Sequence, residues 1–96
     1  MLIDNILRID SKWNGTVVSR ISMLAGTDVT NKDDGFITFA TAAAGSISEA
    51  MRIESDGKVG ILNSSPSQAL HVTGNILASG TITPSSDIAF KKDVKP

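Results

Sequence analysis

Residues 49–61 have the sequence EAMRIESDGKVGI, which predicts a β-hairpin. Asp56-Gly57 is a strong signal for a tight turn. On both sides of this turn apolar residues alternate with other residues, at Met51, Ile53, Val59 and Ile61. Because side chains alternate between the two faces of a strand, the two apolar pairs should lie on the same face of the hairpin.

The sequence on the N-terminal side of this hairpin also predicts strands. Asn14-Gly15 is a second tight-turn signal, between a short strand that ends near Ile9 and a strand over residues 16–24. In the second of these strands, one face should carry Val17, Ser19, Ile21 and Met23. Residues 28–35 are polar and predict a loop, and residues 36–40 predict a further strand. Residues 41–48 are small and predict a loop, a tight crossing or a short helix.

Composition excludes several classes of protein. The 96 residues have a net charge of −1, which argues against a nucleic-acid-binding surface. There is no cysteine, so no disulfide or thiolate chemistry is expected, and no apolar run is long enough to insert into a membrane. No constellation of residues indicates a cofactor or a metal site. We therefore expect a mainly β protein without bound cofactors.

Charge divides the chain into three segments. Residues 59–86 contain no Asp, Glu, Lys or Arg, whereas charges are frequent before and after them. We therefore predict a β-rich body, hairpin-like or sandwich-like, over residues 1–62, an uncharged β stem over 63–86, and a charged segment over 87–96.

The uncharged stem predicts association with identical chains. It has too few large apolar residues for a core of its own, and it lacks the charges that keep an edge strand solitary. We expect the chains to wind around a shared axis that is lined by Leu70, Val72, Ile76 and Ile82. A trimer suits such an intertwined stem, a triple-stranded β-helix or β-prism, although this physical argument does not distinguish three chains from two.

Two motifs in order resemble a phage tail fibre. The hairpin sequence is followed by Ser65-Pro66, Leu70-His71-Val72 and Gly74-Asn75-Ile76, and then by residues 86–94, SDIAFKKDV. This order is similar to the end of a tail fibre or tailspike and the first residues of its C-terminal intramolecular chaperone, the peptidase S74 family. The resemblance implies a homotrimeric structural segment in the tail fibre of a virion. Such a segment supports attachment to a glycan or protein receptor on the host.

The resemblance also implies a self-cleavage junction between Ser86 and Asp87. In the family, the serine hydroxyl attacks its own carbonyl and a lysine accepts the proton, and Lys91 has the matching position here. Ala89 and Phe90 stand where the family usually has a basic residue and leucine. The body of the chaperone, which positions these groups, is absent from the 96 residues. We therefore expect the junction to be uncleaved and the chain not to be an enzyme. The alternative is a precursor fragment that cleaves itself once.

A second alternative is a carbohydrate-binding module with Trp13 and Phe36 or Phe39 as a sugar platform. This alternative requires an exposed aromatic side chain, whereas we expect Trp13 to be a packing residue. His71 could hold a metal on a trimer axis, but its alternation with Leu70 and Val72 favours a surface residue. The spacing of Asp28, Asp33 and Asp34 lacks a full calcium-ligand pattern and favours a solvated turn.

Overall fold

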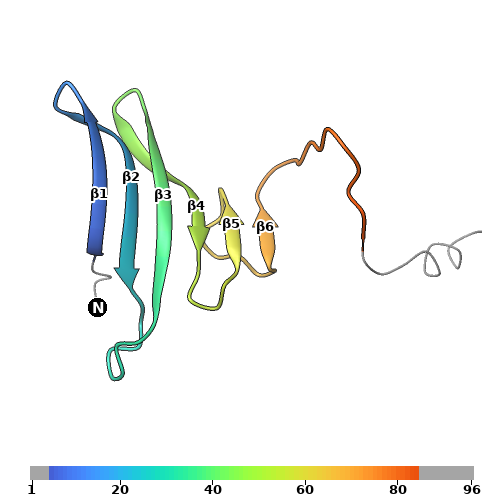
Figure 1. The fold of residues 1–96 in the computed structure, drawn as a ribbon, viewed down its shortest axis with the longest axis horizontal. Helices are drawn as coiled ribbons and strands as arrows, with labels where there is room; N and C mark the ends of the chain where they lie inside the picture. Colours follow the sequence, from blue (N-terminus) through green and yellow to red (C-terminus); the bar gives the residue numbers. More distant parts are fainter. Residues whose placement is uncertain (1–4, 85–96) are drawn as a thin grey trace, which may run out of the picture.

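The computed structural model describes residues 5–84, which form one six-stranded sheet and no helix. The strands follow one another across the sheet in the order in which they occur in the chain (Figure 1). They are β1 (Asn5–Trp13), β2 (Thr16–Ala25), β3 (Gly35–Ala43), β4 (Ser46–Ile53), β5 (Val59–Ile61) and β6 (Leu70–Val72). The mainly β fold is confirmed. Within residues 5–84 there is no helix that could span a membrane.

The predicted tight turns are present. Asn14 and Gly15 join β1 to β2 with φ of 52° and 86°, which is the left-handed geometry of a type I′ hairpin turn. Residues 54–58 join β4 to β5, and the amide of Gly57 donates a hydrogen bond to the carbonyl of Glu54 at 2.9 Å. In this hairpin Met51 pairs with Ile61 and Ile53 pairs with Val59, so the predicted register is confirmed.

Of the predicted loop, tight crossing or short helix over residues 41–48, only a tight connection of two residues is present. β3 continues to Ala43, β4 begins at Ser46, and only Ala44 and Gly45 lie between them. These two residues have φ of 53° and 84°, as in the turn at Asn14-Gly15. Pairing between β3 and β4 outweighs the local preference of alanine for helix, since each residue pair adds hydrogen bonds and cross-strand contacts.

The register has three irregularities, at Ile6, Val18 and Ala50, and the last two decide which face the neighbouring side chains occupy. Ser11 pairs with Ser19 but Lys12 pairs with Val17, so the register skips Val18. The predicted placement of Val17 on the face of Ile21 is therefore wrong, because a one-residue bulge moves the following side chains to the other face. A second bulge skips Ala50, between the pairs Phe39–Met51 and Ala40–Glu49.

The last strand belongs to the sheet, which extends past residue 62 into the predicted stem. β6 pairs with β5 in parallel, and the connection between them crosses over Gly60. A Cβ atom on Gly60 would overlap the carbonyl oxygen of Asn63 and would lie 3.4 Å from Cδ of Pro66. Residues 73–84 form no strand and lead away from the sheet beyond β6 (Figure 1).

The sheet is a single layer, and the protein measures 16 Å along its shortest axis. Among residues 5–84 only Ser22, Ala40, Gly60 and Pro66 are buried. None of the large apolar side chains in this part of the chain is fully buried. The described part of a single chain therefore has no hydrophobic core.

Candidate assembly surface

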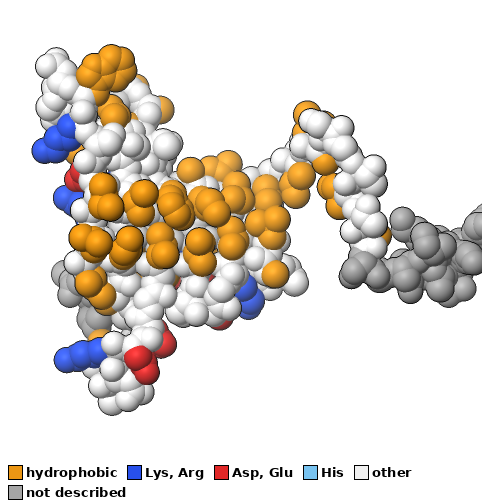
Figure 2. Space-filling model, in the orientation of Figure 1, with side chains coloured by type: hydrophobic (Ala, Val, Ile, Leu, Met, Phe, Trp, Pro, Cys, Tyr) orange, Lys and Arg blue, Asp and Glu red, His pale blue; other side chains and the backbone are white. Residues whose placement is uncertain are grey.

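Two rows of apolar side chains cross one face of the sheet from β1 to β6 (Figure 2). Residues that pair directly across neighbouring strands point to the same face, so the register defines both rows. The first row consists of Leu7, Met23, Ile37, Ile53, Val59 and Leu70. The second row consists of Ile9, Ile21, Phe39, Met51, Ile61 and Val72. We call these twelve residues the apolar stripe.

The apolar stripe is open to solvent in the single chain. Its most accessible members keep between 36% and 57% of their surface exposed: Leu7, Ile9, Ile21, Met23 and Leu70. Complete burial of such a side chain contributes roughly 2 kcal/mol, so covering the exposed half would contribute about 1 kcal/mol for each. These five residues would together contribute about 5 kcal/mol per chain, which is comparable with the whole stability of a small domain. The stripe thus offers a large stabilisation to any apolar surface that covers it.

Polar residues border the apolar stripe on the same face. Ser11 pairs with Ser19, Ser19 with Thr41, and Thr41 with Ser48. The hydroxyl oxygens of Ser11 and Ser19 are 2.9 Å apart and share a hydrogen bond. These residues limit the apolar stripe along one of its two sides, and the stripe itself carries no charge.

The opposite face of the sheet pairs its own charges. Arg20 donates a hydrogen bond of 2.7 Å from Nε to Oδ1 of Asp10, its partner in the register. Arg8 approaches the other carboxylate oxygen of Asp10 at 3.4 Å. The hydrogen bond from Arg20 is the main reason that the pKa of Asp10 is below its ordinary value. This charged face also contains the buried Ser22 and Ala40.

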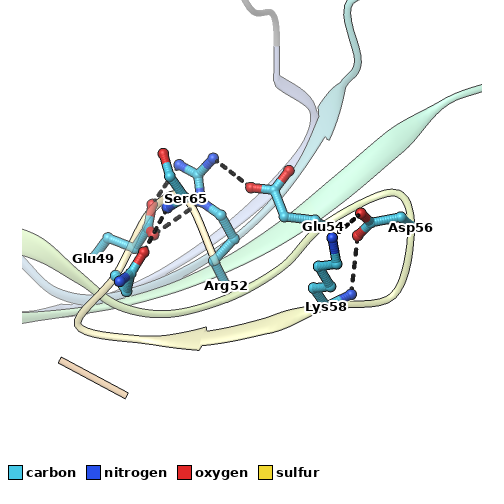
Figure 3. Close-up of polar contacts among 7 residues, drawn as sticks. Glu49, Arg52, Glu54, Asp56, Lys58 and Ser65 are labelled. Atoms are coloured by element: carbon cyan, nitrogen blue, oxygen red, sulfur yellow. Dashed lines mark hydrogen bonds and ion pairs between the residues drawn. The ribbon is translucent and has the colours of Figure 1, made fainter. Parts of the chain in front are cut away.

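Arg52 organises a second charged cluster on the same face, between Glu49 and Glu54 (Figure 3). Its Nη2 donates to Glu49 at 2.8 Å, its Nε donates to the same carboxylate at 3.0 Å, and its Nη1 donates to Glu54 at 3.0 Å. Its guanidinium also lies 4.7 Å from the centre of the Phe36 ring. The bonds to Glu49, followed by those to Glu54, raise the pKa of Arg52 above its ordinary value despite partial burial. Such internally paired charges are compatible with a face that stays in water.

The acidic loop between β2 and β3 forms hydrogen bonds among its own residues. Carboxylate oxygens of Asp28, Asp33 and Asp34 lie within 4.8 Å of one another. Oδ1 of Asp28 accepts hydrogen bonds from the backbone amides of Thr30 and Asn31, both at 3.1 Å. The bonds from Asn31 are the main reason that the pKa of Asp28 is lowered. Hydrogen bonds within the turn thus account for the position of the Asp28 carboxylate.

His71 lies on the face that alternation predicts, and Trp13 is exposed. His71 pairs with Gly60, on the face opposite Leu70 and Val72, and its Nδ1 accepts a hydrogen bond of 3.1 Å from the Ser67 amide. This position agrees with alternation along the strand. Trp13 is 77% exposed in the single chain, so within the described residues it does not fill a core.

An exposed aromatic is what the carbohydrate-binding alternative requires, and Trp13 is one. The other two aromatics of that alternative are separated. Phe39 belongs to the apolar stripe, whereas Phe36 lies on the charged face against Arg52. The alternative requires only one of the two phenylalanines, so their separation does not decide against it.

The predicted site residues fall into three groups. Ser86, Asp87 and Lys91, the residues of the cleavage junction, lie outside the described residues. Leu70 and Val72 end the two rows of the stripe, while Ile76 and Ile82 lie beyond the sheet and are 64% and 71% exposed. Sequence reasoning does not assign the ten other members of the stripe to a shared axis, although alternation places Met51, Ile53, Val59 and Ile61 on one face of their hairpin.

Neither a scan against protein-family models nor a search of curated proteins finds a match to this chain. The geometry described above makes the apolar stripe, with the charged face behind it, the candidate site.

Proposed function

We propose that this chain is a structural segment of a homotrimeric phage tail fibre that supports attachment to a host surface receptor. The observation that carries the proposal is a sheet without a core, in which the apolar stripe is uncovered. The order of the hairpin motif, the uncharged stem and the Ser86-Asp87 motif supports the assignment to a tail fibre in the virion.

Association would bury apolar surface that the single chain leaves exposed. A single-layer sheet gains little from burial, and small chains with poor cores commonly depend on oligomerisation for their stability. Cyclic symmetry repeats one contact around an axis, so a weak contact per chain becomes several contacts per assembly. The uncharged stem, with Ile76 and Ile82 exposed, gains in the same way.

The mass of the protein in solution tests this proposal. We expect light scattering coupled to gel filtration to give three times the chain mass of 10.1 kDa over a wide range of concentrations. A folded monomer would refute the proposal. Changing Ile76 and Ile82 together to Asp should weaken the trimer, because like charges would converge near the axis.

We further propose that the chain is not an enzyme and that the junction at Ser86-Asp87 stays intact. Intact-mass spectrometry of the purified protein should then show one species of full length. A species that ends at Ser86 would instead support the self-cleaving alternative, and a Ser86→Ala variant should abolish that species.

The exposure of Trp13 favours a second candidate function, binding of a host glycan. A glycan that stacks on the indole should change the fluorescence of Trp13, which is the only tryptophan in the chain. A Trp13→Leu variant that retains binding of such a glycan would exclude this role.

A further inference from the structure

We propose that copies of this chain bind one another through the apolar stripe, with three stripes facing a common axis that runs across the strands. This inference rests on the proposed homotrimer. It adds the surface of contact, the direction of the axis and the alignment of the copies.

The width of the apolar stripe supports convergence on an axis. Each strand contributes two apolar residues to it, and residues two apart on a strand are separated by about 7 Å. Ser11, Ser19, Thr41 and Ser48 border the stripe on the same face. A strip two residues wide, with a polar border along one side, can face two identical strips across an axis, whereas a two-layer sandwich would favour a broader apolar face.

The path of the chain supports the direction of the axis. The six strands follow in sequence order from one edge of the sheet to the other, and residues 73–84 continue beyond β6 on the same side (Figure 1). The chain therefore advances along the stripe. An axis parallel to the stripe would continue from the sheet into the stem, where Ile76, Leu77 and Ile82 are exposed. One uninterrupted axis would then accommodate both sets of apolar side chains.

The chemistry of the two faces supports an identical chain as the occupant. The stripe has no charge, so the surface that matches it is itself apolar, and a second stripe meets this condition. The charged face is unsuited to the axis, because Asp10 with Arg20 and Arg52 with Glu49 are already paired and would lose hydration there. The stripe therefore turns inward and the charged face outward.

Single cysteines test the alignment of the copies, since the chain has none of its own. Around an axis parallel to the stripe, each residue meets its own copies at one level. Leu7→Cys in β1, Phe39→Cys in β3 and Leu70→Cys in β6 should each form disulfides between identical positions under mild oxidation. Neighbours on the charged face serve as matched controls, and Arg8→Cys, Thr38→Cys and His71→Cys should not form disulfides within the assembly.

The pattern of disulfides separates the alternatives. An antiparallel two-fold sandwich would link identical residues only near the middle of the stripe, and an axis along the strands would separate the copies of Leu7 and of Leu70. Disulfides at Phe39→Cys alone, or at none of the three stripe positions, would overturn the inference. If the mass of the protein were still that of a trimer, the proposed function would stand. A monomeric wild-type chain would overturn both.

A matched pair of charges gives an independent measurement. Phe39→Asp would place three carboxylates on the axis, whereas Thr38→Asp adds the same charge to the opposite face. We expect Phe39→Asp to shift the mass by light scattering from trimer to monomer and Thr38→Asp to leave the trimer intact. A trimer of Phe39→Asp that is as resistant to dilution as the wild type would overturn the inference. If Phe39→Asp fails to fold, the cysteine variants still test the inference.

Discussion

Replacing Gly60 by alanine should dislodge the last strand of the sheet. Gly60 is the buried central residue of β5, and the loop that leads to β6 packs against it. The added Cβ would overlap the backbone oxygen of Asn63, and it would also contact Pro66. Because the obstacle is backbone, a change of side-chain rotamer does not relieve the clash. The loop over residues 63–66 must therefore move.

The size of the effect follows from what that loop holds in place. Overpacking of this kind typically costs about 1–3 kcal/mol. Movement of the loop also strains two hydrogen bonds beside β6, from Val59 to Ala69 at 2.9 Å and from Thr73 to Ile61 at 3.0 Å. The lower entropy of alanine in the unfolded chain offsets roughly 0.4–1 kcal/mol. We therefore expect the free energy of unfolding to fall by about 2 kcal/mol per chain.

Gly80→Ala is the matched control, because a Cβ atom at Gly80 meets nothing within 4 Å. Urea denaturation of both variants at one protein concentration gives the comparison, and amide hydrogen exchange at Thr73 reports on β6. We expect Gly80→Ala to stay within about 0.5 kcal/mol of the wild type or to gain slightly. The argument from the contact between Gly60 and the Asn63 backbone would be refuted if Gly60→Ala were as stable as Gly80→Ala and the Thr73 amide kept its protection from exchange.

Three further results are expected. Ala44→Asn should raise the free energy of unfolding by about 0.5–1 kcal/mol in urea denaturation, since asparagine tolerates the φ of 53° better than alanine, and unchanged stability would contradict this. The pKa of Asp10 is lowered in the fold chiefly by the bond from Arg20, so its contribution to stability is present above pH 3.8 and is lost as the pH falls through the lowered pKa. Asp10→Asn should therefore flatten the acid limb of a pH–stability curve, and an unchanged slope would count against the ion pair. Arg52→Lys should cost about 1 kcal/mol of thermal stability, because lysine cannot reproduce the paired bonds to Glu49, and an unaltered melting temperature would argue that the cluster contributes nothing.

Local signals in the sequence were sufficient for part of the fold. Asn14-Gly15 and Asp56-Gly57 locate two of the hairpin turns, because Asn14, Gly15 and Gly57 accept a positive φ at low cost. Alternation of apolar residues at Met51, Ile53 and Ile61 predicts the hairpin to which these residues belong. These features depend only on neighbouring residues, so they are visible without the partner strands.

Other features depended on pairing between distant residues. The turn at Ala44-Gly45 has a weak local signal, and the pairing of β3 with β4 imposes it. The skipped residues Val18 and Ala50 are likewise set by the fit between strands, which no local pattern reports. The scarcity of aromatics favours a buried Trp13, but the described residues of one chain form no core that could bury it.

The sequence by itself determined the mainly β character, two of the turns and the absence of charge over residues 59–86, since each is a property of composition or of adjacent residues. Only the tertiary structure decided that apolar residues from six strands form one continuous stripe. The physical reason is that side chains alternate with a period of two, so a slip of one residue in any pairing would send that strand's apolar side chains to the other face. The register over the whole sheet therefore creates the surface on which the proposed assembly depends.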